Sequence, residues 1–583
     1  MSLSWHRCVA AFFASALALL VCAPMRPQQS NGDSVLRLTT RVVNINVVVT
    51  DKQGNPVKGL TKEDFTVLDA GQAQKISFFT AVDNEQPFAT SVSTGVRPDP
   101  NTYTNTVVNG SAEPSVTILL FDTLNSRWTS QGYGLYCLRK FVRQLDPEDH
   151  IGVYVLGDDL KVVHEFSRDA TDLAAAIRRY DERHSPDVRK LPPSEQSAED
   201  ARLDRFLSGK DNHGNVWMQH ANGAYMRAHL AIARETTTAW LEVIARQLSG
   251  VPGRKTLIWV TDSIGQLGLF DENDLDEYLT AWRKDAGVMF GGPRNLRNRD
   301  DIERMIRLMN NAGIAVYPVD ARGLEAMDLG FRDNASAAAI VSPTGPVEHL
   351  LARIPEPDPG ALEIAYRTGG RAFYNRNDLE TGIRRALNDS RFTYELAYHP
   401  DHDRWKGEWR RIQVKVNRPE VTVLARAGYF AMPDPRPLAP KNRIEFLSQI
   451  TASPLNAAEL PLTVQVGSAT NGKTGQELAA RVHMSPQSML TMQENGHWKG
   501  NFEVMFMQTD VKSKLLDATQ KNVDADLDAD EYAEIVRNGW DLPVQLKLMP
   551  GATMLCVILH DKSSDSAGSV RIPLAAYAPA RVH

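Results

Sequence analysis

Asp122 ends an apolar run and begins a cluster of oxygen-bearing side chains whose types and spacing suit ion or partner binding. Residues 116–122 read Val-Thr-Ile-Leu-Leu-Phe-Asp, and Thr123, Asn125 and Ser126 follow directly. An apolar, β-branched run of this length predicts a buried strand. Ligands of open parallel sheets bind beyond the carboxyl ends of the strands, and hard divalent cations prefer carboxylate and hydroxyl oxygens. The segment therefore predicts a polar site at a sheet edge.

A second apolar run ends in the same way. Residues 255–262 lead into Asp262, and Ser263 comes next. Because parallel strands end at a common edge of a sheet, we expect the carboxylates of Asp122 and Asp262 to lie close together. These two carboxylates and the hydroxyl of Ser126 are the predicted metal ligands.

Leu124 interrupts the ligand pattern. A strand end that holds a cation in this way carries Asp-x-Ser-x-Ser, and Leu124 stands where the first serine is expected. Since leucine offers no oxygen, one ligand is missing. Two interpretations stay open: a Mg²⁺ or Mn²⁺ site, or a cap of hydrogen-bonded polar side chains that needs no cofactor. The second is favoured.

The bulk composition is that of a globular protein without a nucleic-acid surface. Of the 583 residues, 42% are apolar and 23% are charged, and the formal net charge is -6. Nucleic-acid binding needs clustered positive charge, and the chain has no lysine- or arginine-rich run to supply it. The 4 cysteines, two of them in the first 23 residues, are too few for a disulfide framework.

The first 23 residues have the pattern of a secretory signal peptide. His6 and Arg7 precede an apolar run, 8–23, that is too short to span a bilayer comfortably. We therefore expect export to the periplasm or the extracellular space and no transmembrane segment in the mature chain. Lipidation at Cys22 is an alternative, which Val21 disfavours because it is large for the position before a lipidated cysteine.

Hydrophobic periodicity divides the remaining chain into β-rich regions and a region of alternating strands and helices. The alternating region predicts an α/β fold class with a doubly wound parallel sheet, and short strands between turns predict flanking β-sandwich domains. The two β segments beside the α/β region each hold too few strands for a core, so we expect them to pair. In order, the predicted parts are a β segment (33–82), a linker (83–114), the α/β domain (115–390) with an insertion (181–222), the paired β segment (391–432), a linker (433–442) and a C-terminal β-sandwich (443–583).

Four segments carry a family resemblance. They are 47–57 (VVVTDKQGNPV), 60–65 (LTKEDF), 251–262 (VPGRKTLIWVTD) and 421–430 (VTVLARAGYF). In this order they resemble the bacterial VWFA-related domain family, which is related to the von Willebrand factor type A domain. The resemblance covers residues 33–432 and implies a Rossmann-like fold, export, and a binding or scaffolding role. It implies no reaction.

The resemblance also implies a metal-ion-dependent adhesion site, in which the carboxylate of a partner protein completes the shell of a bound cation. Asp122, Ser126 and Asp262 match its ligand pattern, and Leu124 does not. A loop threonine is expected as a further ligand, but the threonines at 236–238 fall inside a predicted helix. The implied adhesion site is therefore degenerate.

The chain lacks the common catalytic motifs. It contains no Gly-x-Ser-x-Gly elbow, His-Glu-x-x-His pair, Gly-x-Gly-x-x-Gly turn or Gly-Lys-Ser/Thr phosphate loop. The histidines and aspartates of 399–403 have metal-ligand types, but a hairpin tip explains the same composition because Asp and Pro initiate turns. Nothing in the sequence assembles a nucleophile with a base.

We therefore predict a non-enzymatic, exported protein that binds another protein as an adhesin or scaffold through the strand-end face. Asn125, Ser263 and Trp217 are the predicted partner contacts, the last of them within the insertion. The alternative is an envelope-associated hydrolase with an unrecognised site in the C-terminal region. The sequence does not identify the partner.

Overall fold

The computed structural model describes most of the chain beyond its first 40 residues. The predicted signal peptide (1–23), most of the predicted linker (83–114) and most of the insertion (181–222) lie outside the described part. Among the helices that the structure describes, none combines the length and the apolar character needed to cross a membrane. The described residues are 41–83, 101–105, 116–184, 216–261, 299–321 and 359–577, with short internal gaps.

The chain is built mainly of antiparallel β-sheet, so the predicted fold class, an α/β doubly wound parallel sheet, is wrong. Strand residues outnumber helical residues, and the sheets are several and mostly antiparallel. Parallel pairing among the described strands is confined to one 5-stranded sheet. The prediction failed because it took the class from the longest strand–helix region, whereas the β-rich segments around that region supply most of the strands.

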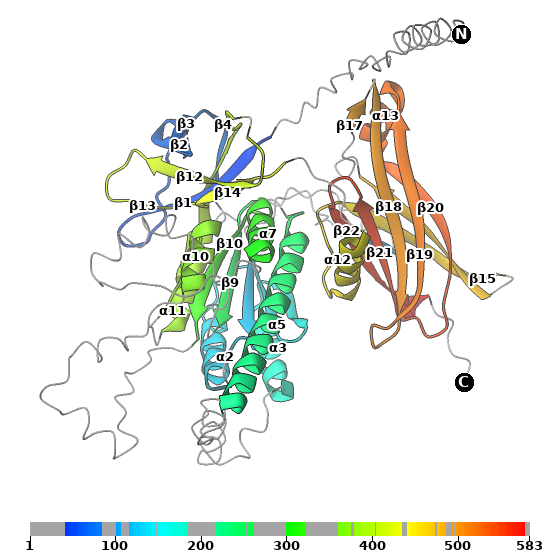
Figure 1. Cartoon of the computed structure of the whole chain (residues 1–583), viewed down its shortest axis with the longest axis horizontal. Helices are drawn as coiled ribbons and strands as arrows, with labels where there is room; N and C mark the ends of the chain where they lie inside the picture. The colour runs from blue at the N-terminus through cyan, green and yellow to red at the C-terminus, as the bar shows by residue number, and fades with distance from the viewer. Residues whose placement is uncertain are drawn as a thin grey trace, which may run out of the picture.

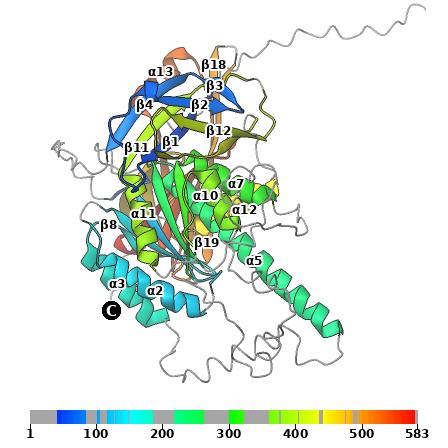
Figure 2. The same cartoon turned by 90° about the vertical axis from the view of Figure 1, so that its left-hand side faces the viewer.

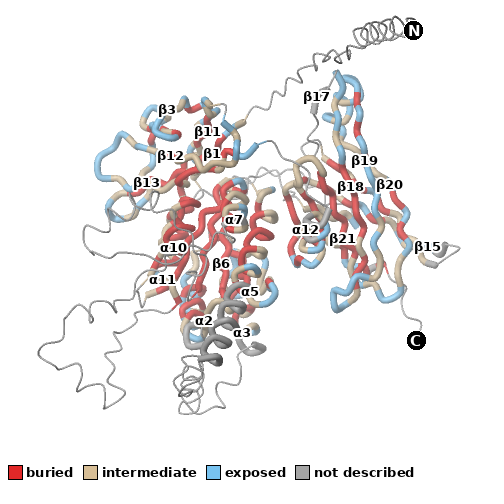
Figure 3. Tube along the Cα trace, in the orientation of Figure 1, coloured by how far each residue is buried: buried red, intermediate tan, exposed pale blue. Residues whose placement is uncertain are grey.

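The central sheet has the strand order β10-β9-β6-β7-β8. Strands β10, β9, β6 and β7 run parallel, and β8 runs antiparallel to β7 at one edge because a tight turn joins the two. Their side chains are almost entirely buried except in β8 (Figure 3). The strands are β6 (Thr117–Asp122), β7 (Ile151–Leu156), β8 (Leu160–Ser167), β9 (Lys255–Thr261) and β10 (Ile314–Asp320).

Helices cover both faces of the central sheet because successive side chains of a strand point to opposite sides. In β6, Ile118 and Leu120 belong to one core, and Leu119 and Phe121 belong to the other. The first core is closed by α5 (Val216–Leu248), α7 (Arg299–Asn311) and α10 (Pro359–Thr368), and the second by α2 (Trp128–Val142), α3 (Ala170–His184) and α11 (Leu379–Arg391).

Strands from before and after the central sheet form a first sandwich. In one sheet, β1 pairs with β11 so that Asn46 lies opposite Glu395, and in the other β12 pairs with β2. One apolar core lies between the two sheets. The sheets are β13 (Thr422–Leu424), β1 (Val43–Thr50), β11 (Phe392–Tyr398) and β4 (Ile76–Asp83), and β14 (Gly428–Ala431), β12 (Glu408–Val416), β2 (Phe65–Asp69) and β3 (Gln72–Gln74).

The C-terminal strands form a second sandwich, which recruits a strand from far away in the sequence. Within the predicted linker 83–114, β5 (Thr102–Thr104) pairs with β15, and Asn105 donates to the carbonyls of Ala457 (2.7 Å) and Leu460 (2.9 Å). The other strands are β15 (Leu462–Gly472), β16 (Gly475–Met484), β20 (Trp540–Lys547), β17 (Met492–Glu494), β18 (His497–Thr509), β19 (Leu515–Leu527), β21 (Met554–Asp561) and β22 (Ala567–Pro573).

The first sandwich and the second sandwich both contact the central sheet or its helices. Figures 1 and 2 show the first sandwich beyond one end of the central sheet, and Figure 1 shows the second sandwich beside it. Helix α12 (Pro440–Ala452), which begins inside the predicted linker 433–442, packs against the second sandwich. The carboxyl-terminal ends of the central strands point away from the first sandwich, because Gly253 and Gly313, just before β9 and β10, lie against its residues.

Candidate functional site

Asp122 is the last residue of β6, and its side chain is completely buried. Its Oδ1 accepts a hydrogen bond from the backbone N–H of Asn125 (2.9 Å), and its Oδ2 accepts one from Asn125 Nδ2 (2.8 Å). The Trp259 indole N–H (3.0 Å) and the Thr261 hydroxyl (3.1 Å) also donate to Oδ2. One neighbouring strand, β9, and the loop after β6 therefore both donate hydrogen bonds to this carboxylate.

Asn125 and Thr237 fix the loop that follows β6. Asn125 Nδ2 donates to Thr237 Oγ1 (2.9 Å), and that hydroxyl donates to the carbonyl of Ala233 one turn earlier in α5 (2.7 Å). From the other side, Gln131 of α2 donates to the carbonyl of Ser126 (2.8 Å). Since α5 and α2 cover opposite faces of the sheet, the loop is tied to both layers of helices.

The electrostatics at Asp122 are those of a carboxyl group surrounded by neutral donors. Burial raises the pKa of the Asp122 carboxyl above its usual value, and the hydrogen bonds from Asn125, Trp259 and Thr261 oppose that rise. Within the described part of the chain, no lysine or arginine forms an ion pair with it. Among the described residues, the groups that stabilise this carboxylate are neutral hydrogen-bond donors.

The structure places only some of the other site residues that the sequence predicts. Leu124 is partly buried and packs against the apolar core between the sheet and α5. Ser126 lies in the bend after β6. Trp217 falls in α5, but its side chain is outside the described residues, and Asp262 and Ser263 are outside them altogether. Of the predicted partner contacts, only Asn125 is placed, and its side chain is already bonded to Asp122 and Thr237.

The described oxygens at Asp122 are already engaged in hydrogen bonds, and the predicted ligand Asp262 lies outside the described residues. Oδ2 already accepts three hydrogen bonds, and Leu124 supplies no oxygen. Across the residues that the structure describes, no three or more His, Cys, Asp or Glu side chains are grouped so that they could hold a metal ion. What the residues form is a polar cap that fixes a loop.

Acidic side chains are exposed next to this cap. Asp122 pairs in register with Leu156, the last residue of β7, and the turn after Leu156 carries Asp158 and Asp159, both exposed. Thr123 joins the loop to this turn, because its backbone N–H (2.8 Å) and its hydroxyl (2.9 Å) both donate to the Leu156 carbonyl. We call residues 123–126 and 157–159 the rim.

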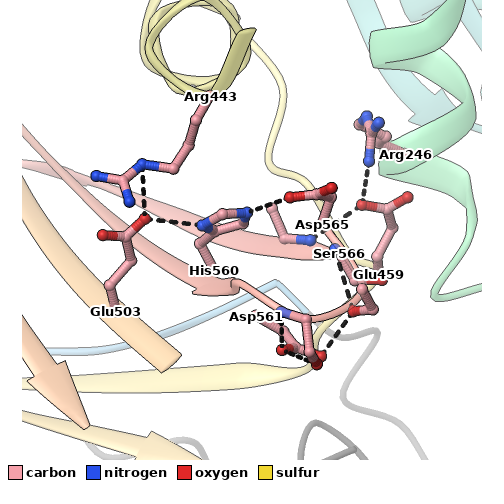
Figure 4. Close-up of polar contacts among 11 residues, drawn as sticks. Arg246, Arg443, Glu459, Glu503, His560, Asp561, Asp565 and Ser566 are labelled. Atoms are coloured by element: carbon pink, nitrogen blue, oxygen red, sulfur yellow. Dashed lines mark hydrogen bonds and ion pairs between the residues drawn. The ribbon is translucent and has the colours of Figure 1, made fainter. Parts of the chain in front are cut away.

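A second polar cluster, which sequence reasoning missed, is buried in the C-terminal sandwich (Figure 4). His560 Nδ1 lies 2.8 Å from Glu503 Oε1, and His560 Nε2 lies 3.4 Å from Asp565 Oδ1. Gln520 donates to the other Glu503 oxygen (2.7 Å). The side chains of His560 and Glu503 are 0% exposed, so a substrate in solvent cannot reach the imidazole.

In the sequence, this cluster shows as one polar, ionisable residue among apolar residues on each of two paired strands. Glu503 lies directly opposite His560 in the register of β18 and β21, and Met505 and Met507 follow it on the same face beneath α12. Alternation alone predicts a solvated face at these positions. Knowing that α12 covers the face would have been necessary to recognise a buried pair.

Arg246 joins the central module to the C-terminal sandwich (Figure 4). Its guanidinium forms an ion pair with Glu459 and lies over the Phe446 ring, 4.6 Å from the centroid. Its backbone carbonyl accepts a hydrogen bond from Ala458 (3.0 Å). With both charged side chains largely buried, this contact is a fixed junction between modules.

In the described part of the loop 399–402, the imidazole of His402 is engaged in hydrogen bonds. His402 Nε2 lies 2.8 Å from the Tyr429 hydroxyl, and His402 Nδ1 accepts from the backbone N–H of Arg404 (3.2 Å). The Tyr429 hydroxyl in turn donates to the buried Asp69 (2.9 Å). Both imidazole nitrogens are therefore engaged, and the ring stacks on Trp405 with centroids 4.5 Å apart.

Comparison with known proteins does not identify a family. No family model matches the chain, and no curated protein matches it. The resemblance to VWFA-related proteins therefore stays a prediction.

Among solved structures the similarity is weak. An aerotolerance-related membrane protein of Bacteroides fragilis is 11% identical, over 47% of this chain and 98% of that one, with a TM-score of 0.22. A mutant of the PilB minor pilin of Streptococcus sanguinis is 13% identical, over 49% of this chain and 63% of that one (TM-score 0.21). The pilus adhesin SpaC of Lactobacillus rhamnosus GG is 9% identical, over 89% and 57% (TM-score 0.21). These scores carry no argument about fold or function.

Proposed function

We propose that the protein is an exported, non-enzymatic adhesion or scaffold protein that binds a protein partner through the rim without a divalent cation. The Asp122 cap is the observation that carries the proposal. Its hydrogen bonds to Asn125, Trp259 and Thr261 hold the rim loop in one conformation, as a bound ion would otherwise do. A pre-organised loop on a rigid sheet loses little entropy when a partner binds.

The position of the rim supports the same conclusion. At the opposite edge of the central sheet, Arg254 Nη1 donates to the carbonyl of Asn46 (3.5 Å), so the first sandwich sits on the amino-terminal ends of the strands. The rim is at the other end, and it exposes the carboxylates of Asp158 and Asp159. An acidic, rigid edge fits a partner with a basic contact surface.

The hydrolase alternative gains no support from the buried polar cluster of the C-terminal sandwich. The histidine of that cluster, His560, faces Glu503 and Asp565 but is completely buried. A general base must come within hydrogen-bond reach of its substrate, and this one is sealed beneath α12. Among the described residues the cluster therefore has a structural role.

Partner capture with matched charge reversals tests the proposal. The full chain, the rim variant Asp158→Lys/Asp159→Lys and the control Asp524→Lys/Glu534→Lys, at exposed positions of β19 and α13 (Ala529–Asn538), would each be immobilised and exposed to envelope extract. We expect the wild type and the control to retain a common protein, with or without EDTA, and the rim variant to lose it. Capture that survives the rim reversal, or that disappears with EDTA, would contradict the proposal.

A further inference from the structure

His560 lies between two acidic side chains in the interior of the second sandwich (Figure 4). Its Nδ1 is 2.8 Å from Oε1 of Glu503, which faces it across the paired strands β18 and β21, and its Nε2 is 3.4 Å from Asp565 Oδ1. The side chains of His560 and Glu503 are 0% exposed, and that of Asp565 is 18% exposed. Each imidazole nitrogen therefore faces a group that accepts hydrogen bonds when it is ionised.

The neighbours of Glu503 decide which imidazole nitrogen carries the proton when His560 is neutral. Glu503 Oε2 accepts a hydrogen bond from Gln520 Nε2 (2.7 Å), and Nε of Arg443 on α12 lies 3.6 Å from Oε1. Both neighbours favour the ionised carboxylate, so Nδ1 of His560 must be the donor to Oε1. Because a neutral imidazole has a single N–H, its Nε2 is left with a lone pair that faces Asp565.

The Nε2 atom of His560 is a buried acceptor that lacks a donor. Within the described part of the chain, it has no hydrogen-bond partner. Buried polar atoms usually have partners, so this one needs an explanation. A proton at Nε2 would replace the contact between two acceptors by a charge-assisted hydrogen bond from the imidazolium to Asp565.

The charged groups that face His560 also favour one additional positive charge. Glu503 of β18 and Asp565 of the turn after β21 bring two negative charges, and Arg443 of α12 brings one positive charge. Phe446 of α12 adds an uncharged ring whose centroid lies 5.5 Å from that of the imidazole. Among these neighbours, protonation of His560 therefore balances the charges of the cluster.

Two other charged side chains of the β21–β22 hairpin are engaged elsewhere. Asp561 follows His560 along β21 and so points to the opposite face of the sheet, where it accepts a hydrogen bond from the Ser563 hydroxyl (2.6 Å). Lys562 donates to Asn522 Oδ1 (3.1 Å). Neither of these contacts involves the imidazole, so Asp565 is the group that a proton at Nε2 would bind.

The geometry points to His560 as an acid-operated latch on the turn 562–566, which joins β21 to β22. In the pH range where histidines gain a proton, Nε2 takes up a proton from solvent and donates it in a hydrogen bond to Asp565. The latch is open when His560 is neutral, because Nε2 and the carboxylate then repel each other. It closes in acid, and Asp565, which is partly exposed, connects the imidazole to solvent.

The latch acts on the junction between the second sandwich and the central module. Directly after the turn, the backbone N–H of Ala567 donates to Glu459 Oε2 (3.0 Å), and Glu459 forms the ion pair with Arg246 of α5. A turn held by His560 therefore holds this junction more firmly in acid. The inference uses no residue of the rim, so failure of either proposal leaves the other intact.

Amide hydrogen exchange of the full chain tests the latch. Rates measured at about pH 8 and about pH 5.5, which bracket the range of histidine, would be corrected for the intrinsic pH dependence of exchange. In the wild type we expect the turn 562–566 and Ala567 to open about 10-fold less often at the lower pH, because a charged hydrogen bond is added. Protection that does not change with pH would overturn the inference.

Asp565→Asn is the decisive variant, because its carboxamide can bond Nε2 in either protonation state. The amide N–H donates to the neutral imidazole, and the amide oxygen accepts from the protonated one. Asp565 has φ of 56°, which asparagine adopts readily, so the backbone tolerates the change. Protection of the turn should be equal at the two pH values in this variant, and a change as large as that of the wild type would contradict the latch.

The matched control is His497→Gln, which removes an exposed histidine that also pairs with an aspartate, Asp526 (3.1 Å). This variant should keep the pH response of the turn. Loss of the response in the control would assign it to His497 and overturn the inference.

The position of the proton gives a second readout that does not depend on exchange rates. In nitrogen-15 NMR of the chain labelled at its 14 histidines, His560 is the residue whose imidazole signals change in Asp565→Asn and not in His497→Gln. We expect a proton on Nδ1 alone at about pH 8, and protons on both nitrogens at about pH 5.5. A proton on Nε2 at the higher pH would contradict the latch.

Discussion

The buried charged residues at the two ends of the central strands, Asp122 and Lys255, differ in how many hydrogen bonds they make. At the carboxyl-terminal edge, Asp122 accepts hydrogen bonds from Asn125, Trp259 and Thr261. At the amino-terminal edge, Lys255 makes one hydrogen bond, to a backbone carbonyl, while Glu395 lies nearby. A carboxylate with several donors fixes the conformation of its loop, whereas a buried amine with a single acceptor is held by one contact only.

The difference follows from what lies on each side of the sheet. The carboxyl-terminal edge is completed within one module, by β9, α5 and the loop after β6, so local folding can satisfy Asp122. The amino-terminal edge is a junction between modules, where Asn46 and Glu395 arrive on strands of the first sandwich. Side chains that meet only after two modules dock have fewer ways to rearrange into hydrogen-bonded pairs.

The largest expected effect comes from removing the satisfied carboxylate. Asp122→Ala leaves the buried donors of Asn125, Trp259 and Thr261 without their acceptor, which should cost the central module about 3–5 kcal/mol of stability. Calorimetric unfolding of the full chain would show the transition of this module at a lower temperature. The control Asp159→Ala, at an exposed position of the rim, should change little. Equal decreases of the unfolding temperature in the two variants would show that the hydrogen bonds to Asp122 do not stabilise the central module.

The pH dependence of stability tests the environment of Lys255 at the amino-terminal edge of the central sheet. Burial lowers the pKa of the Lys255 ammonium from 10.5 to about 8. Between these pH values the unfolded chain binds more protons than the folded chain, so stability should rise with pH, by about 3 kcal/mol. Denaturant unfolding at a series of pH values measures it. The variant Lys255→Met should lack this rise in stability, and a similar rise in that variant would assign the effect to another group.

A smaller effect tests whether the cap extends into α5. Thr237→Val keeps the shape of the side chain but removes the acceptor of the Asn125 amide, and should cost about 1 kcal/mol. Thr238→Val is the matched control, since the Thr238 hydroxyl bonds only within its own helix, to the carbonyls of Arg234 and Glu235. Amide hydrogen exchange in the rim loop should accelerate in the first variant and not in the second. No difference between them would exclude Thr237 from the cap.

Local signals in the sequence were informative where the partners are close in the chain. The spacing of Asp528 and Glu531 is typical of a helix start, and Gly539 is typical of a helix end. In the structure Asp528 accepts from the backbone N–H groups of Asp530 and Glu531, and Gly539 has φ 74°. Asp122 could be recognised as a strand-end carboxylate for the same reason. Its donors Trp259 and Thr261 could not, because they come from a neighbouring strand that is distant in sequence.

Features that depend on long-range pairing were beyond sequence reasoning. Strand β5 has three residues, and only its register with β15 distinguishes it from the linker that its composition predicts. Thr237 was set aside because it lies in a helix, yet its hydroxyl reaches Asn125. The fold class was misjudged because periodicity describes each segment separately, whereas the class depends on how many strands each segment contributes.

Thermal unfolding in Mg²⁺ and Mn²⁺ tests the central claim, that the rim is held by hydrogen bonds without a cation. The wild type and Leu124→Ser, which restores the serine of the expected ligand pattern, would be titrated and compared. A bound ion raises the melting temperature as its concentration passes the dissociation constant. Our account predicts no rise in either chain, because the Asp122 oxygens are occupied and Leu124 belongs to the core. A rise in the wild type that Asp122→Ala abolishes would contradict it.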